Sequence, residues 1–404
     1  MDRPRTRVLL ISTVPTHPMT AGNRARVYAL LEALETLGVD FHLAYITWED
    51  ADIKAMQARW GESRVSLIAQ KLTQNYSALW RRIRNRSLRT LGWERFHPSE
   101  VDCYRSPGLE CAILDIGRIF RPVCVLVEYV FNSWMLELFP ASVRKVIDTH
   151  DKFANRYAQF LKAGVAPEWF STTPGQERKG LRRADCVMAI QQGEADYFQQ
   201  LSGRPVVTVG HVCRLRPTPE PAAGPITLLY IGSNNHANQD AMTGCLQEIW
   251  PGLHRQHPTA RLLVAGGVCE SLGQPPPGVE LRGQVASLDG LYAAAHIVIN
   301  PMRAGTGLKI KCLEALSHGK PLVTTPVGAA GLETGAGDAF LVGPDSAGVA
   351  RHCLELMQSP ARRSDLATRA MEFIKDWNCR QAAALQAALL TVGMSGKGKE
   401  HEES

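Results

Sequence analysis

A glycine-rich stretch followed by an acid-bearing helical pattern marks the segment NPMRAGTGLKIKCLEALSHGKPLVTTPVG, residues 300–328. Gly305 and Gly307 let the backbone approach a ligand closely, and a helix directly behind them would point its free N–H groups at the same place. On that helix Lys311 and Glu314 stand three positions apart and therefore share a face. The pattern predicts a site for a phosphate-bearing ligand whose other half meets the glutamate. The alternative is a glycine turn beside a surface ion pair.

Two named phosphate-binding patterns do not fit this stretch. The pattern G-x-x-x-x-G-K-[ST] is not matched, and GTGLKI has Ile310 where G-x-G-x-x-G needs its third glycine. The segment therefore needs an explanation other than a P-loop or a dinucleotide fingerprint.

A second candidate is VIDTHDKFANR, residues 146–156. A strand that ends at Thr149 would leave His150 and Asp151 in the loop that follows it. The alternative is a helix start, with Thr149 or Asp151 as the N-cap. Arg156 is interpreted as a candidate for a surface ion pair.

A third candidate is THPMTAGNRARVYALL, residues 16–31, where Gly22 and Asn23 stand at a strand-to-helix turn. Arg24 and Arg26 follow at the predicted helix N-terminus. The helix macrodipole disfavours cations there unless an anion lies nearby, which favours a phosphate partner. The alternative is a pair of ordinary solvated arginines.

The elements that must position these residues are short apolar runs alternating with helical patterns. This order predicts an α/β fold with parallel, doubly wound sheets. The proline-rich stretch CRLRPTPEPAAGP at 213–225 divides the chain into two Rossmann-like units of similar size. The expected division is an N-terminal domain at 1–213, a linker at 214–225, a C-terminal domain at 226–372, a terminal helix at 373–392 that could return to the first domain, and a polar, disordered tail at 393–404.

The candidate loops all follow predicted strands and lie at 13–24, 128–134, 149–156, 232–238, 266–270 and 301–308. In open α/β sheets, ligands bind beyond the carboxyl ends of the strands. With two such units joined by one linker, the cleft between them is the expected site.

Composition narrows the class of protein. A chain of 404 residues is too long for one ordinary core, and 45 Lys+Arg against 39 Asp+Glu give a net charge of only +6. The ten cysteines contain no C-x-x-C pair, which disfavours zinc-ribbon and thioredoxin-type sites and favours a reducing compartment. The opening MDRPRTRVLLISTVP predicts a buried strand and not a signal peptide. No apolar run approaches the roughly 18 residues of a membrane span, so a soluble or peripheral protein is expected.

The run from Pro301 to Gly328 strongly resembles the nucleotide-sugar site of family-four-type glycosyltransferases, in the pattern P-x-R-x-G-x-G-x-x-x-K-x-x-E-A-L-x-x-G-K-P-L-V-T-T-P-V-G. Residues 228–267 and 282–301 are also similar to that family's second domain. Its members are retaining enzymes with the GT-B fold, two Rossmann-like domains facing each other across a cleft. The resemblance implies a donor side on the C-terminal domain and an acceptor side on the N-terminal domain.

The resemblance also implies roles for the matched positions. The carboxylate would hold the ribose, the cations and loop amides would face the diphosphate, and the histidine would contact the donor sugar. The implied catalytic residues are His150, Lys311 and Arg303; the donor-binding residues are Glu314, Gly305, Thr306, Gly307, Gly232 and Ser233; the acceptor and phosphate loop contributes Gly22, Asn23 and Arg26.

Two departures from the family pattern concern the donor sugar and the diphosphate. An E-x7-E spacing would place a first glutamate at position 306, where this chain has Thr306. The family also often has an arginine and a lysine after the domain's first strand, where this chain has SNNHANQ. The subset of the family with G-x-G-x-x-x-K-x-x-E shares both departures.

The activity that the resemblance implies is retaining transfer of a hexose-type sugar from a UDP- or GDP-linked donor to a glycan or lipid-linked glycan, in cell-surface polysaccharide or glycoconjugate synthesis. No obligatory metal is implied, and DAD at 50–52 is interpreted as a chance match to a metal-binding D-x-D. The alternatives are a nucleotide-sugar 2-epimerase on the same scaffold and a catalytically silent sugar-nucleotide or glycan binding subunit.

A basic segment, ALWRRIRNRSLRTLGWERF at 78–96, carries six arginines against one acid. It predicts either a peripheral contact with an anionic membrane, which would bring a cytoplasmic enzyme to a lipid-linked acceptor at the inner face, or a solvated helix of the first domain. Nucleic acid is not an expected partner, because no recognised binding motif accompanies the arginines.

Overall fold

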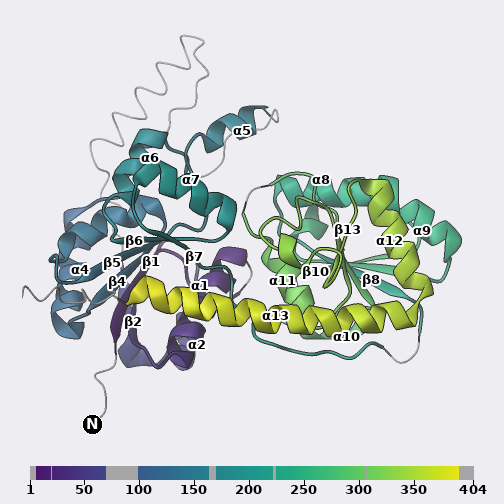
Figure 1. Cartoon of the computed structure of the whole chain (residues 1–404), viewed down its shortest axis with the longest axis horizontal. Helices are drawn as coiled ribbons and strands as arrows, with labels where there is room; N and C mark the ends of the chain where they lie inside the picture. The colour runs from purple at the N-terminus through teal and green to yellow at the C-terminus, as the bar shows by residue number, and fades with distance from the viewer. Residues whose placement is uncertain are drawn as a thin grey trace, which may run out of the picture.

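Two parallel sheets form the framework of the molecule (Figure 1), as seen in a computed structural model that describes residues 6–19, 21–69, 99–162, 170–221, 224–305 and 307–390. The first sheet has the strand order β3-β2-β1-β4-β5-β6-β7 and the second the order β10-β9-β8-β11-β12-β13. Helices cover the faces of both sheets. The α/β fold class predicted from the sequence, with two Rossmann-like units, is confirmed.

The first sheet is built from short apolar runs, and the residues of its central strands are almost all buried. Its strands are β1 (Arg7–Ser12), β2 (Asp40–Ile46), β3 (Val65–Ile68), β4 (Cys124–Glu128), β5 (Arg144–Asp148), β6 (Cys186–Ala189) and β7 (Val206–Thr208). The helices around it are α1 (Gly22–Thr36), α2 (Ile53–Trp60), α4 (Pro107–Phe120), α5 (Arg156–Lys162), α6 (Pro174–Leu181) and α7 (Gln192–Ser202), with the 3₁₀ segments η1 (Glu62–Arg64) and η2 (Val130–Leu138).

The second sheet repeats the architecture with β8 (Thr227–Ile231), β9 (Arg261–Ala265), β10 (Val279–Gly283), β11 (Ile297–Asn300), β12 (Leu322–Thr324) and β13 (Leu341–Val342). Its helices are α8 (His236–Gly244), α9 (Trp250–Gln256), α10 (Asp289–Ala294), α11 (Ile310–Ser317) and α12 (Ser346–Gln358), with the short segments η3 (Cys245–Ile249), η4 (Gly267–Ser271) and η5 (Glu333–Gly335).

The strand order reverses direction at equivalent places in the two sheets. β1 lies between β2 and β4, and β8 lies between β9 and β11. At such a switch point the loops after neighbouring strands diverge and leave room for a ligand. The loops after β8 and β11 and the helices that follow β1 and β11 carry the candidate residues other than His150, which follows β5, so the topology itself gathers them at two places.

The helical run from His236 to Gln256 is not a regular α-helix throughout. α8 ends at Gly244, and the π-helical segment η3 separates it from α9, in which Pro251 is the second residue. Proline has no backbone N–H to donate to the preceding turn, so the chain widens there instead of continuing as a regular α-helix.

A single long helix, α13 (Pro360–Leu389), connects the two halves of the molecule (Figure 1). Ala370 and Ile374 belong to an apolar core of the second sheet, whereas Leu385 and Leu389 belong to the core of the first. The helix is continuous through the boundary predicted at 372–373, and its last turns pack on β5, β6 and β7. The domain boundaries themselves stay a prediction.

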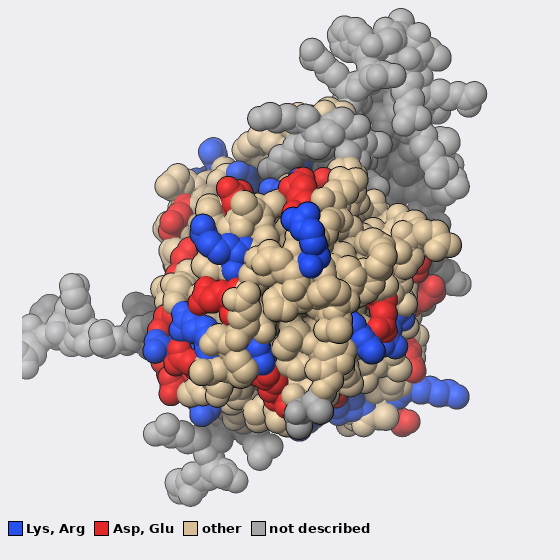
Figure 2. Space-filling model, turned by 90° about the vertical axis from the view of Figure 1, so that its right-hand side faces the viewer, with Lys and Arg blue, Asp and Glu red and all other residues tan. Residues whose placement is uncertain are grey.

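Within the described residues, no helix is long and apolar enough to cross a membrane. The basic segment 78–96 and the tail at 393–404 lie outside the described residues, so their predicted roles stay predictions. On the face of the molecule shown in Figure 2, acidic and basic side chains are interspersed and form no single-sign field.

Candidate active site

The loop after β11 has the backbone that its glycines predict. Gly305 and Gly307 have φ values of 123° and 74°, in the left-handed region that favours glycine. Thr306 between them lies outside the described residues. Lys309 folds back on this loop, and its Nζ donates to the carbonyl oxygens of Gly307 at 2.7 Å and Gly305 at 3.4 Å. Lys309 therefore stabilises the conformation of this loop through its backbone carbonyls, a role that the sequence did not predict.

Lys311 points from α11 towards the loop after β8. Its Nζ donates to Asn238 Oδ1 at 2.7 Å and to the Tyr230 hydroxyl at 3.3 Å. Asn238 in turn donates from Nδ2 to the Ser233 carbonyl oxygen at 3.0 Å. Burial lowers the pKa of Lys311 to about 8. The structure thus links Lys311 to the predicted Gly232–Ser233 loop through Asn238, which no sequence pattern had singled out.

Gly232 occupies a place where two loops touch backbone to backbone. Gly266, after β9, has a φ of 92°, and a Cβ atom there would lie 2.3 Å from the Gly232 carbonyl oxygen. The floor of the candidate donor site is therefore made of main chain, and the N–H groups of Gly232 and Gly266 donate to the carbonyl oxygens of Ala265 and Gly283.

Glu314 is a partly buried carboxylate that makes no hydrogen bond or ion pair with any described residue. Burial raises the pKa of Glu314 to about 7, while the charges of Arg216 and Lys311 oppose that rise. It shares a helix face with Lys311, as the spacing predicts. A carboxylate in this setting has its acceptor capacity available for a ligand.

Arg303 is directed at a different element. Its guanidinium forms an ion pair with Glu248 Oε1 at 2.6 Å. It fits there because Gly244 has no side chain, since a Cβ atom at that position would lie 2.1 Å from Arg303 Nη2. The side chain thus lies against α8 and η3, and its role at a diphosphate stays a prediction.

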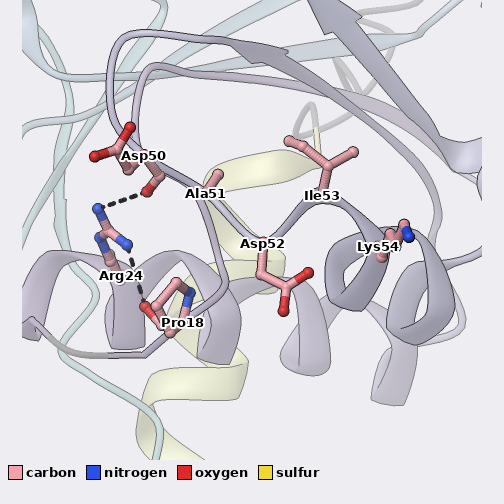
Figure 3. Close-up of a pocket in the computed structure, with 7 residues that line it drawn as sticks. All are labelled: Pro18, Arg24, Asp50, Ala51, Asp52, Ile53 and Lys54. Atoms are coloured by element: carbon pink, nitrogen blue, oxygen red, sulfur yellow. Dashed lines mark hydrogen bonds between the residues drawn. The ribbon is translucent and has the colours of Figure 1, made fainter.

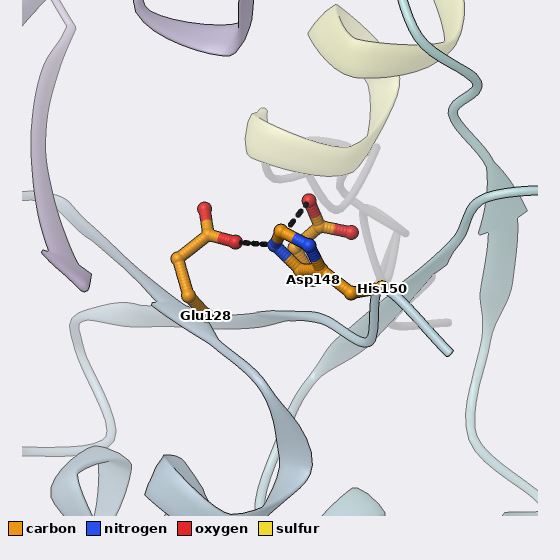
Figure 4. Close-up of side chains that lie close together, drawn as sticks. All are labelled: Glu128, Asp148 and His150. Carbon is orange, nitrogen blue, oxygen red and sulfur yellow. Dashed lines mark hydrogen bonds and ion pairs between the residues drawn. The ribbon is translucent and has the colours of Figure 1, made fainter. Parts of the chain in front are cut away.

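The predicted residues of the first domain converge on a buried group of charges at the ends of β4 and β5 (Figure 4). His150 Nε2 is hydrogen-bonded to Glu128 and lies 3.7 Å from Asp148 Oδ2. Arg26 donates from Nε and Nη2 to the two oxygens of Asp148, at 2.7 Å each, and to the Val209 carbonyl oxygen at 2.9 Å.

A second layer of contacts fixes the imidazole from the other side. The rings of Tyr129 and His150 lie 4.3 Å apart between centroids, and Asn23 Nδ2 donates to the Tyr129 hydroxyl at 3.3 Å. Tyr129 and His150 have φ values of 68° and 58°, which are strained for residues with side chains. Such strain clusters at functional sites, so it supports the choice of His150 as a candidate.

A metal ion does not fit this group of residues well. Ligand atoms of Glu128, Asp148 and His150 lie within 4.8 Å of one another, as in many metal sites. However, the guanidinium of Arg26 engages both oxygens of Asp148, so a cation bound there would face a fixed positive charge. The donor set is that of an internal charge network.

The two arginines at the start of α1 have partners inside the protein. Arg24 Nη2 forms an ion pair with Glu49 at 2.8 Å and also donates to the Asp50 carbonyl oxygen (Figure 3). It borders an open pocket of about 570 Å³ lined by Pro18, Arg24, Asp50, Ala51, Asp52, Ile53 and Lys54. Neither Arg24 nor Arg26 is the solvated arginine of the alternative interpretation. Arg26 needs no phosphate to balance it, so its contacts do not support the predicted phosphate role.

The helix-start interpretation of residues 146–156 is wrong. Helix α5 begins only at Arg156, and Thr149 Oγ1 donates to the Met188 carbonyl oxygen at 3.0 Å instead of capping a helix. Asp151 forms an ion pair with Arg156 at 2.6 Å. β5 ends at Asp148, one residue earlier than predicted, which frees Thr149 and His150 to turn back towards β4.

Two contacts join the domains next to the candidate groups. A Cβ atom at Gly22 would lie 3.5 Å from Ile310 Cδ1, so the first turn of α1 meets the start of α11. A Cβ atom at Gly331 would lie 3.1 Å from the Cβ of Gln191, which precedes α7. The loops after β1 and β11 therefore come together, although nearly 300 residues separate them in the sequence.

The two facing sheets and their switch-point loops define the GT-B class of protein, with two Rossmann-like domains. Residues 225–359 match the family described as glycosyl transferases group 1. This match, over less than half of the chain, confirms the resemblance seen in the sequence.

Solved structures show the same fold over nearly the whole chain. Sucrose-phosphate synthase from Thermosynechococcus elongatus is 17% identical, with a TM-score of 0.64 and coverage of 95% of this chain and 97% of the other. HepE from Anabaena, in complex with UDP and glucose, is 14% identical, with a TM-score of 0.64 and coverage of 95% and 100%. The lipopolysaccharide outer core galactosyltransferase WaaB is 12% identical, with a TM-score of 0.60 and coverage of 95% and 99%. These identities establish likeness of fold alone.

One curated relative matches part of the chain. An uncharacterized 44.6 kDa protein in the cps region of Klebsiella pneumoniae is 23% identical over 155 residues. The match spans 34% of this chain and 39% of the relative.

Several functional candidates had no sequence motif. Glu128 and Asp148 were hidden inside runs predicted as strands, where a single acid in an apolar run is the available signal. Asn238, Tyr230 and Lys309 were recognisable only from contacts between elements that are distant in the sequence.

Proposed function

We propose that this protein is a nucleotide-sugar-dependent glycosyltransferase that transfers a hexose-type sugar, with retention, to a glycan or lipid-linked glycan. The carrying observation is that Glu314, a carboxylate without a hydrogen bond or ion pair to any described residue, shares a helix face with the partly buried cation Lys311, beside the Gly305–Gly307 loop. A carboxylate suits ribose hydroxyls, and a cation beside a glycine loop suits a diphosphate. The two groups therefore match the two halves of a nucleotide.

In the proposed mechanism the donor lies on the second domain and its sugar faces the first. Lys311 and the N–H groups of the glycine loop stabilise the charge that develops on the departing nucleoside diphosphate. His150 meets the sugar from the other domain. The acceptor hydroxyl attacks the anomeric carbon from the face that the diphosphate leaves, the bond from that carbon to the phosphate oxygen breaks, and the hydroxyl proton passes to this oxygen. No step requires a metal ion, because the cation and the loop amides supply the positive potential.

The two candidate classes of donor differ in their base, and UDP-sugars are proposed ahead of GDP-sugars. The support is the similarity of fold to HepE, which was solved with UDP, with UDP-glucose and with UDP and glucose. A cell-surface glycan as acceptor is supported by the similarity to WaaB and by the relative in a cps region. The ten cysteines in the described residues are all free, which supports a cytoplasmic location for the proposed enzyme.

The experiment that tests this function measures binding and transfer separately. Thermal shift against UDP- and GDP-sugars identifies the donor, and Glu314→Gln and Lys311→Met are then compared with wild type. Each variant is expected to weaken donor binding by about tenfold or more, because each removes a charged partner of the ligand. Glu372→Gln and Lys375→Met are matched controls, since both residues are exposed on α13.

Three outcomes would contradict the proposal. Near-normal binding and turnover in both site variants would remove Glu314 and Lys311 from the site. An epimerised donor formed without acceptor would identify the 2-epimerase. Binding with no turnover on any glycan acceptor would identify a silent binding subunit.

A further inference from the structure

The charges around His150 do not balance unless one additional proton is present. Arg26 engages both oxygens of Asp148, so these two groups neutralise each other. Glu128 is fully buried, and its Oε2 is hydrogen-bonded to His150 Nε2. Its other oxygen, Oε1, has no hydrogen-bond partner among the described residues.

An ionised carboxylate without a cation is costly at such a position, by several kcal/mol on general grounds. Burial raises the pKa of Glu128, and the charge of His150 opposes that rise. The imidazole is the group that can supply a compensating charge through Nε2, because the guanidinium of Arg26 is already committed to Asp148. The pair of Glu128 and His150 therefore favours a state that holds one proton between them.

We propose that Glu128 is a positioning residue for His150: the two side chains share one proton between the carboxylate and Nε2, so that the ring presents Nδ1–H as a hydrogen-bond donor towards the ligand. If the shared proton lies on Nε2, the imidazolium carries hydrogen on both nitrogens. If it lies on Glu128, neutral imidazole accepts at Nε2 and carries its hydrogen at Nδ1. Both forms have the same donor at Nδ1, which has no hydrogen bond to any described residue.

The surroundings keep this arrangement in place. The ring of Tyr129 lies against the imidazole, and the strained backbone at both residues holds the ring where Glu128 can reach it. The charged groups that act on the pair are Arg26 and Asp148, and Tyr129 lies against the ring. Around these neighbours, Glu49 and Asp151 act on Tyr129, and Glu194 acts on Arg26. Neither Asp151 nor Glu194 is hydrogen-bonded to the imidazole, so Glu128 is the carboxylate that fixes its nitrogens.

The role of Nδ1–H rests on the proposed function, because it assumes that a donor sugar or acceptor lies next to His150. The protonation of the ring does not rest on it. The first measurement is therefore made without substrate, on full-length protein labelled with ¹⁵N in histidine, in which His150→Gln assigns the resonances. Wild type is expected to show a protonated Nδ1 throughout the neutral range.

Two substitutions separate the contributions of Glu128. Glu128→Met keeps the approximate volume but cannot share a proton, so deprotonated Nδ1 is expected to appear as the pH rises above about 6.5, the ordinary range of histidine. Glu128→Gln can donate its amide hydrogen to Nε2 and thus keep Nδ1–H, so it is expected to rescue the wild-type spectrum in part. An unprotonated Nδ1 in wild type would overturn the proposal even if Glu128→Met fails to fold.

The second measurement is turnover in a double-mutant cycle. Glu128→Met is expected to lower kcat by about tenfold to a hundredfold, with the loss growing as the pH rises and the donor KM changing little. In a His150→Ala background the same substitution should cost little more, because Glu128 acts through His150. Additive losses would indicate a merely structural role and overturn the proposal. If no transfer occurs in any variant while the nitrogen spectra follow expectation, the proposed function fails and the proton sharing stands.

Discussion

Glu314 and Lys311 show how one helix face can hold two groups whose charge states respond to burial in opposite directions. Burial raises the pKa of Glu314 to about 7 and lowers the pKa of Lys311 to about 8. The carboxylate is a full acceptor only above the first value, and the lysine is a full cation only below the second. At the residue scale, the charge states suited to a nucleotide coexist in a narrow interval around neutral pH.

This interval leads to a prediction about donor affinity. Binding of UDP-glucose is expected to be tightest between about pH 7 and pH 8, because protonation of Glu314 weakens it below and deprotonation of Lys311 weakens it above. Calorimetric titration across the neutral range is the measurement, and this donor suits it because its diphosphate diester keeps a constant charge. Glu314→Gln should abolish the acid limb and Lys311→Met the alkaline limb. A flat affinity profile in wild type would show that these groups do not contact the ligand.

At the scale of elements, the loops after β8 and β9 depend on each other because their main chains are in contact. Gly266 has a φ of 92°, and a Cβ atom added to it would lie 2.3 Å from the Gly232 carbonyl oxygen. A side chain at Gly266 would displace the backbone of Gly232, because the nearest atoms among the described residues are backbone atoms and not a flexible side chain that could move aside instead. The same contact brings the Gly232–Ser233 loop to Asn238 and Lys311.

Gly266→Ala is therefore expected to destabilise the protein by about 1–3 kcal/mol and to weaken donor binding. Urea unfolding and calorimetry are the two measurements. Gly273→Ala is the matched control, since a Cβ atom at Gly273 meets nothing within 4 Å. Equal stability of the two variants would mean that the loops accommodate a side chain and that their contact does not shape the site.

At the scale of the whole molecule, α13 is hydrogen-bonded to the segment that joins the two sheets, between β7 and β8. Gly210 N–H donates to Gln381 Oε1 at 2.7 Å, and Trp377 Nε1 donates to the His211 carbonyl oxygen at 2.7 Å. Arg26 reaches the same segment through the Val209 carbonyl oxygen. The buried charges of the first domain, the joining segment and the terminal helix are thus one connected set of hydrogen bonds.

Gln381→Ala removes the acceptor of a buried backbone N–H and is expected to destabilise the protein by about 1–3 kcal/mol. Gln386→Ala is the control, because Gln386 is exposed on the same helix. Urea unfolding compares the two variants. Equal unfolding midpoints would show that the joining segment is held by packing, such as that of Trp377 on Gly210, and not by this hydrogen bond.

The sequence by itself determined the repeated strand–loop–helix order, because apolar periodicity and glycine placement are local properties that short-range sterics impose. It also determined that Gly305, Gly307, Lys311 and Glu314 lie close together, since they fall within one turn-and-helix unit whose geometry follows from their spacing.

Only the tertiary structure decided what the charged residues do. Arg26 was predicted to face a phosphate, yet it is bound to Asp148, a residue more than 100 positions away. Glu128 was hidden in a strand, and its meeting with His150 depends on β4 and β5 ending side by side. The free energy of a buried charge depends on which partners the fold brings to it, and no spacing along the chain contains that information.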